Sequence, residues 1–255
     1  MSAEGLHVSE VTVRFGGLVA VNGVSLQAPM GQITGRLGRN GAGKSTMFNA
    51  CSGLVKPQAG TVALNGRTLS DLSPQARAQA GLGRTFQRME LYDRLTVEDN
   101  VLLGREALAA GRRLATTLYQ PRALRAQLRA SRDEAIELCG LSELRHRAAG
   151  SLSTGQQRLV ELARAVAGGY DFLLLDEPSS GLDHSESAAF GHILTSVVAA
   201  RGTGILLVEH DIALVTTVCA YAYVVDFGTL IAQGPTAEVM ASSAVRTAYL
   251  GEGAA

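Results

Sequence analysis

The sequence predicts an α/β fold: a parallel sheet covered by helices, with an antiparallel β subdomain and an inserted helical subdomain. A glycine-rich segment at 38–43 lies between a short strand pattern and a helical one. From residue 151 onward, short apolar stretches alternate with helical ones. Such strands are typical of a parallel sheet buried on both faces, and 255 residues suffice for one large domain of this kind.

Residues 6–15 and 18–26 alternate apolar and polar side chains, and Gly16-Gly17 separates them. This pattern predicts an antiparallel hairpin. The other elements expected before residue 90 are a strand at 33–37, a helix from 44 to about 53, a strand and tight turn at 61–66, a helix opened by Ser73-Pro74 and a strand at 82–87.

Residues 97–147 are rich in Ala, Leu, Arg and Glu, and Pro121 interrupts them. We expect a helical subdomain at about 91–149, inserted between core segments at about 1–90 and 150–255. Its basic residues favour solvated faces of amphipathic helices over a site for nucleic acid or anionic lipid. They are Arg105, Arg112, Arg113, Arg122, Arg125, Arg129 and Arg132.

The C-terminal part predicts alternating helices and strands that end in a hairpin. The expected elements are a helix at 156–167, a strand at 172–176, a helix at 185–200, a strand at 204–208, a helix from Asp211 and a hairpin at 223–233 that bends at Phe227-Gly228.

The segment from Gly38 to Ser45 fits the P-loop pattern G-x-x-x-x-G-K-[ST], between a strand and a helix as that pattern requires. Backbone N–H groups of such a loop converge on phosphate, and the helix start adds positive charge. Lys44 would reach the β- and γ-phosphates of ATP and Ser45 would be a ligand of Mg²⁺. Lysine occurs only at 44 and 56, so a chance match is improbable. The candidate nucleotide-binding residues here are Gly38, Asn40, Gly41, Ala42, Gly43, Lys44, Ser45 and Thr46.

The apolar stretch at 172–175 ends in Asp176 and Glu177, at the carboxyl end of a strand, where α/β sheets bind ligands. Asp176 would hold Mg²⁺ through its water shell, and Glu177 would accept a proton from the attacking water. The alternative is an acidic cap of the following helix.

Residues 152–157, Leu-Ser-Thr-Gly-Gln-Gln, open a helix ahead of these carboxylates and decide against that alternative. The chain resembles an ATP-binding cassette (ABC) ATPase over nearly its whole length, and this segment is similar to the signature sequence of that family. The resemblance implies a P-loop NTPase core of the RecA-like type. Further matches are Gln87 with the Q-loop, 180–183 with the D-loop, His210 with the switch histidine and Phe15 with the aromatic residue that stacks on adenine.

The resemblance implies that Gln87 contacts Mg²⁺ or the attacking water and that His210 contacts the γ-phosphate. It implies that Ser153, Gly155 and Gln156 belong to the signature that faces the P-loop of a second cassette, identical or paralogous, so that two ATP molecules lie between the two. Without the resemblance, Ser153 would be an ordinary helix cap and Phe15 a core residue.

Segments 84–87, 91–101, 206–211 and 248–252 look like ATPases of branched-chain amino-acid importers, and a related lipopolysaccharide-export ATPase shares much of this pattern. We therefore expect an ATP-hydrolysing subunit bound to transmembrane permease subunits. The alternatives are an ATPase of lipopolysaccharide-type export, a regulator that no longer hydrolyses ATP, and a non-transport ABC ATPase.

The composition limits partners and compartment. Basic and acidic residues number 23 each, so no overall charge favours nucleic acid. Three cysteines without a C-x-x-C pair indicate a reducing compartment. The first ten residues lack the apolar core of a signal peptide, so we expect a peripheral subunit on the cytoplasmic face of the cell membrane.

Three positions depart from the family pattern: Thr154 in the signature, Arg39 in the P-loop and Arg36 in the strand before it. We expect little effect at Thr154. Arg39 would contact phosphate or point into water. A charge at 36 should need a nearby carboxylate or a path to solvent.

Overall fold

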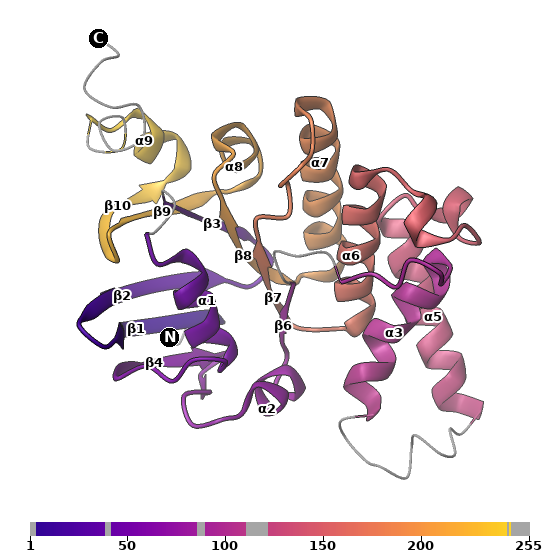
Figure 1. The fold of residues 1–255 in the computed structure, drawn as a ribbon, viewed down its shortest axis with the longest axis horizontal. Coiled ribbons are helices and arrows are strands. Elements are labelled where there is room, and N and C mark those ends of the chain that lie inside the picture. The colour runs from indigo at the N-terminus through magenta and orange to yellow at the C-terminus, as the bar shows by residue number, and fades with distance from the viewer. Residues whose placement is uncertain (1–3, 39–41, 86–89, 111–121, 244, 246–255) are drawn as a thin grey trace.

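The computed structural model describes residues 4–38, 42–85, 90–110, 122–243 and 245, with the side chains of 106–110 left out (Figure 1). Two sheets and their helices form the fold. A six-stranded sheet lies at its centre, a four-stranded sheet on one side of it, and helices on the other.

The central sheet has the strand order β10-β9-β3-β8-β7-β6. Neighbouring strands from β9 to β6 are parallel, and β10 is antiparallel to β9. All residues of β3, β7 and β8 are buried, which explains the apolar runs of β7 and β8. The strands are β3 (Ile33–Leu37), β6 (Leu82–Arg84), β7 (Phe172–Asp176), β8 (Gly204–Glu209), β9 (Tyr221–Asp226) and β10 (Thr229–Pro235).

The second sheet is antiparallel, with the order β2-β1-β4-β5. Its strands are β1 (Gly5–Phe15), β2 (Leu18–Pro29), β4 (Ala59–Leu64) and β5 (Arg67–Thr68). Helix α1 (Lys44–Ser52) packs between the two sheets, because Met47 and Phe48 share one core with residues of β1, β2 and β7. This core holds the helix that follows the glycine-rich loop.

The opposite face of the central sheet packs against α6 (Thr154–Gly168) and α7 (His184–Arg201) (Figure 1). Helices α3 (Val97–Ala110) and α5 (Arg122–Leu138) pack on α6. The remaining helices are α2 (Pro74–Gln79), α8 (Ile212–Val218), α9 (Thr236–Ala241) and the short 3₁₀ helices η1 (Ser142–Leu144) and η2 (Ala149–Ser151).

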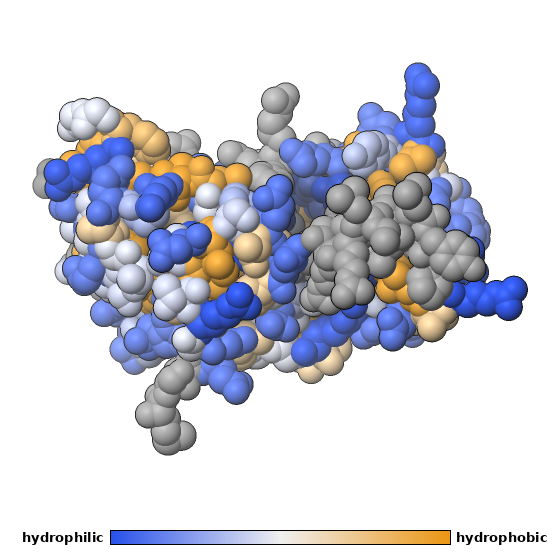
Figure 2. All heavy atoms as spheres, turned by 90° about the horizontal axis from the view of Figure 1, so that it is seen from below, coloured by the Kyte–Doolittle hydropathy of each residue, from blue (hydrophilic) through white to orange (hydrophobic). Residues whose placement is uncertain are grey.

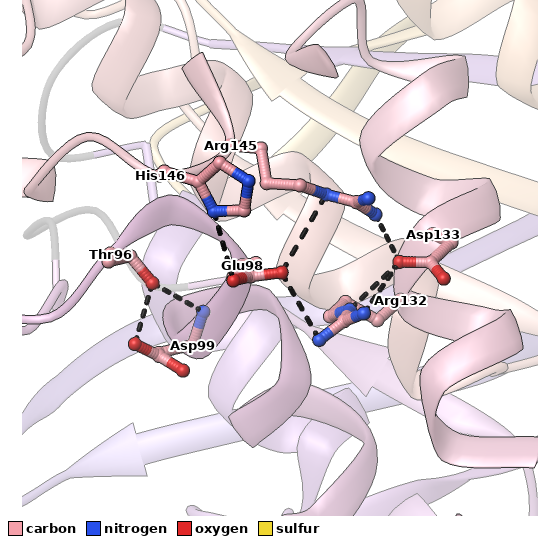
Figure 3. A network of polar contacts seen from close by, with 7 residues as sticks. All are labelled: Thr96, Glu98, Asp99, Arg132, Asp133, Arg145 and His146. Atoms are coloured by element: carbon pink, nitrogen blue, oxygen red, sulfur yellow. Dashed lines mark hydrogen bonds and ion pairs between the residues drawn. The ribbon is translucent and has the colours of Figure 1, made fainter. Parts of the chain in front are cut away.

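An ion-pair network joins α3, α5 and the segment at 145–146 (Figure 3). Glu98 of α3 lies 3.3 Å from Arg132 of α5, 3.7 Å from Arg145 and 3.2 Å from His146. Thr96 precedes α3, and its hydroxyl accepts a hydrogen bond from the Asp99 N–H. Because these groups are partly exposed, each pair contributes little alone, and the network mainly fixes how α3 meets α5.

The predicted order of elements is confirmed, with differences in detail. Strand β6 ends at Arg84 instead of residue 87, and 86–89 lie outside the described residues. Helix α9 was not predicted. Among the described arginines of the helical part, 122, 125 and 129 are exposed as expected. Arg105 instead donates to the Gly168 carbonyl, and Arg132 lies in the ion-pair network.

Arg36 is fully buried, so the solvent path considered for it is wrong. Its Nη2 lies 3.4 Å from the carbonyl oxygen of Ala42, at the end of the glycine-rich loop. The burial follows from the fold, because β3 lies between β8 and β9 and Arg36 stands opposite Val208 and Tyr223. Whether a carboxylate also pairs with it stays a prediction.

The face of the molecule in Figure 2 carries hydrophilic side chains, with hydrophobic areas among them that are wider on the left of the view. Within the described ranges, no helix has the length and apolar character needed to cross a membrane.

Candidate active site

The glycine-rich loop connects β3 to α1, and its two described glycines, Gly38 and Gly43, lie where a side chain would collide with backbone. A Cβ on Gly43 would lie 2.1 Å from the Ala20 carbonyl oxygen, and its φ of 75° is left-handed. A Cβ on Gly38 would lie 2.7 Å from the Val225 carbonyl oxygen. The loop is therefore held against β2 and β9 at a distance that only glycine allows.

Lys44, the first residue of α1, is the buried cation of the site. Its Nζ donates to the Gly38 carbonyl at 2.9 Å and forms an ion pair with Glu177 at 2.8 Å. Lys44 and Glu177 lie on different segments, one after β3 and one after β7, and the fold brings them together as the sequence predicts. The predicted lysine and base thus face one another across the end of the sheet.

Glu177 has a φ of 48°, which is uncommon for a residue with a side chain. Its N–H donates to the Val208 carbonyl at 2.9 Å, which fixes the turn at the end of β7. His210 Nδ1 lies 3.8 Å from one carboxylate oxygen of Glu177, and the His210 side chain is largely exposed. Strained backbone that holds a carboxylate beside Lys44 and His210 is characteristic of functional sites.

Asp176, the last residue of β7, is buried beside Glu177. Arg84 of β6 donates to its carboxylate at 3.2 Å, and the same guanidinium bonds to Asn49 and Ser52 of α1. Burial raises the pKa of Asp176 above its usual value, and Arg84 opposes that shift. Arg84 therefore ties α1 to the strand that presents the acid.

The donor set suits a magnesium nucleotide. Ser45 is exposed at the start of α1, and Thr46 follows it half-buried. A serine hydroxyl and a carboxylate are the oxygen ligands expected where Mg²⁺ is bound partly by substrate phosphates. With the glycine cradle and Lys44, Ser45 and Asp176 fit the group that the sequence predicts.

Ser153 caps α6, as an ordinary helix cap would. Its Oγ accepts from the Gln156 N–H, and the Gln156 side chain accepts from the Ser153 N–H. The hydroxyl acts here as acceptor, so its own proton can still be donated to a ligand. Gly155 lies against α7, since a Cβ on it would be 2.8 Å from the Glu186 carboxylate. The start of α6 is exposed at Ser153.

Phe15 ends β1 and is half exposed, not a core residue. It pairs across the hairpin with Leu18, two residues before Ala20, whose carbonyl touches the loop at Gly43. The aromatic ring therefore lies on the strand pair that adjoins the loop. Asn40, Gly41 and Gln87 lie outside the described residues.

Glu209 and Arg84 are site residues to which the sequence analysis gave no role. Glu209 is fully buried, and its two carboxylate oxygens accept from the Ser179 N–H at 2.8 Å and the His210 N–H at 3.2 Å. It thus joins the loop after Glu177 to His210, and burial raises its pKa. The available signal was an acidic residue at the end of an apolar strand.

A phosphate-binding loop and two acids at one edge of a parallel sheet define a nucleoside triphosphatase of the P-loop class. Comparison with known proteins narrows this class. The sequence profile described as ABC transporter matches residues 21–180, and one described as branched-chain amino acid ATP-binding cassette transporter matches residues 229–255.

Similar proteins cover nearly the whole chain. The high-affinity branched-chain amino acid transport ATP-binding protein LivG of Salmonella typhimurium is 38% identical over 99% of this chain and 100% of its own length. BraF of Pseudomonas aeruginosa, which bears the same description, is 35% identical over the same shares. The lipopolysaccharide export system ATP-binding protein LptB of Haemophilus influenzae is 37% identical over 91% of each chain.

A solved ATP-binding cassette of an ABC transporter, in its ADP conformation, superposes with a TM-score of 0.85 at 28% identity, over 98% of this chain and all of that one. The chain belongs to the ABC transporter family and is an ATP-binding cassette of the kind that hydrolyses ATP.

Proposed function

We propose that the chain is the ATP-hydrolysing subunit that drives import of branched-chain or related amino acids. The observation that carries this proposal is full-length similarity of 35–38% to LivG and BraF, proteins named for branched-chain amino acid transport. The match of residues 229–255 to a profile of the same description supports it at the C-terminal end.

In the proposed reaction, Lys44 and the loop N–H groups bind the β- and γ-phosphates, and Glu177 accepts a proton from the water that attacks the γ-phosphate. Ser45 and Asp176 would hold Mg²⁺, which would neutralise charge on the phosphates. His210, beside Glu177, orients the γ-phosphate. The ion pair of Lys44 with Glu177 supports this assignment, since the proposed phosphate-binding cation and the proposed base lie 2.8 Å apart.

The other assignments are part of the same proposal. Phe15 stacks on adenine, and Asn40, Gly41, Ala42 and Thr46 complete the phosphate loop. Gln87 contacts Mg²⁺ or the attacking water. Ser153, Gly155 and Gln156 complete the site of a second cassette, identical or paralogous. The pair of cassettes binds transmembrane permease subunits at the cytoplasmic face of the membrane.

The test is leucine uptake by membrane vesicles that carry the chain bound to its permease subunits. ATP is enclosed inside the vesicles, and the binding protein and radiolabelled leucine are added outside. We expect ATP-dependent leucine accumulation. Glu177→Gln should keep nucleotide binding but lower phosphate release and uptake by about a hundredfold or more, because the proton acceptor is lost. Phosphate release at the unmodified rate would exclude Glu177 as the base.

A second candidate function is lipopolysaccharide-type export, favoured by the 37% identity to LptB. The two differ in cargo and direction. Vesicles that hydrolyse ATP without accumulating leucine, isoleucine or valine, but release lipopolysaccharide to an acceptor, would favour export.

A further inference from the structure

Arg158 and Glu161 of α6 form a buried ion pair that takes no part in the proposed chemistry. Arg158 Nη1 lies 3.0 Å from a carboxylate oxygen of Glu161, and both side chains are 7% exposed. Their spacing of three residues places them on one helix face. Because burying two charges is costly, such a pair is weak as a source of stability alone.

Each partner also bonds to a different loop beside the site. Arg158 Nη2 donates to the Ser180 carbonyl at 3.2 Å. Glu161 accepts the Glu90 N–H at 3.2 Å, and Arg164, further along α6, donates to the Glu90 carbonyl. Both backbone polar groups of Glu90 are thus bonded to side chains of α6, and through Arg158 the ion pair also reaches Ser180.

The two loops, at Glu90 and at Ser180, each follow a proposed site residue in the sequence. Ser180 is three residues after Glu177, and its N–H donates to the Glu177 carbonyl at 3.1 Å. Glu90 is three residues after Gln87. The loop at 180–183 also lies against the start of α6, since a Cβ on Gly181 would be 3.5 Å from the Thr154 methyl group. A small pocket beside the pair reaches Asp176.

We propose that Arg158 and Glu161 are positioning residues that couple the backbone at Glu90 to the loop after Glu177. If the Glu90 N–H moves away, the Glu161 carboxylate loses one of its hydrogen-bond donors and shifts to find another. Arg158 must then shift with Glu161, because otherwise two buried charges are left poorly paired. The planar guanidinium bonds two acceptors at a fixed angle, so its shift moves the Ser180 carbonyl. A movement at either loop therefore reaches the other.

Hydrogen exchange of the nucleotide-free chain tests the coupling through effects at a distance. Glu161→Gln should make the Ser180 and Leu182 amides exchange about tenfold faster, although the hydrogen bonds that hold these amides go to Glu177 and Ser179. Arg158→Met should do the same for the Glu90 amide, whose hydrogen bond goes to Glu161. If each substitution changes only the loop that its own residue touches, or only α6, the proposal is wrong.

The double variant Arg158→Met with Glu161→Met separates coupling from folding, because apolar side chains often replace a buried pair without loss of stability. It should fold, yet show fast exchange at both loops. Arg201→Met is the matched control: Arg201 pairs with Glu134 at 2.9 Å, between α7 and α5, away from both loops. It should leave both loops unchanged.

The consequence for turnover rests on the proposed function. Each single variant and the double variant should lower kcat for ATP about tenfold and leave KM within about twofold, because the loops are displaced and the phosphate cradle is not. Equal kcat in all variants would overturn the positioning role. If the unmodified chain shows no turnover, the proposed function fails, and hydrogen exchange still decides the coupling.

Discussion

At the residue scale, the proposed catalytic groups are bonded to one another. Lys44 donates to the Gly38 carbonyl and pairs with Glu177, so a phosphate that enters the loop would compete with the carboxylate for Lys44. This exchange would release Glu177 toward the attacking water. The sequence predicted both residues from their motifs. It could not predict Arg84, because a basic residue at a strand end carries no signal until the fold places it beside Asp176.

Gly43 provides the sharpest test of the loop geometry. Gly43→Ala should lower the free energy of unfolding by about 2 kcal/mol and weaken nucleotide binding about tenfold, because the new methyl group would collide with the Ala20 carbonyl at a left-handed φ. Urea denaturation and titration with a fluorescent ATP analogue measure the two effects.

Gly17→Ala is the matched control, because no atom lies within 4 Å of its added Cβ and its φ is not left-handed. It should change neither quantity. Equal behaviour of the two variants would contradict the tight approach of the loop to β2.

At the element scale, α1 is fixed at both ends. At its start, Lys44 bonds to the Gly38 carbonyl of the preceding loop and to Glu177, which is far away in sequence. At its end, Arg77 of α2 donates to the carbonyls of Ala50 and Cys51, at 2.7 Å each, and also to Ser70 and Leu72. The sequence predicted where α1 stops from Gly53, but not this cap, because a capping side chain that is distant in sequence leaves no local pattern.

Arg77→Met should lower the free energy of unfolding by about 3 kcal/mol, because buried carbonyls lose their donors. Arg77→Lys should recover only part of this, since an ammonium group cannot bond four carbonyls in the same directions. Urea denaturation measures both. Arg67→Met, at an exposed position of β5, is the control and should have little effect. A loss for Arg77→Met no larger than for that control would contradict the capping role.

At the scale of the whole molecule, the sequence predicted the fold class and most element positions, because buried parallel strands and the hairpins have strong local patterns. Prediction from the sequence failed where contacts between distant segments determine whether a side chain is buried. Arg36 is buried within β3, and Arg132 is drawn into the network with Glu98. The division into a core and a helical subdomain at about 91–149 stays a prediction. All three cysteines are free thiols and buried, and burial raises the pKa of Cys51 to about 11.

The measurement that tests the account most directly is a crystal structure of the Glu177→Gln chain with ATP and Mg²⁺. We predict that Lys44 leaves residue 177 and bonds to the β- and γ-phosphates, with Mg²⁺ between Ser45, the phosphates and the water shell of Asp176. The account would be contradicted by a nucleotide that is bound elsewhere and makes no contact with the glycine-rich loop, while Lys44 still bonds to the Gly38 carbonyl and to residue 177.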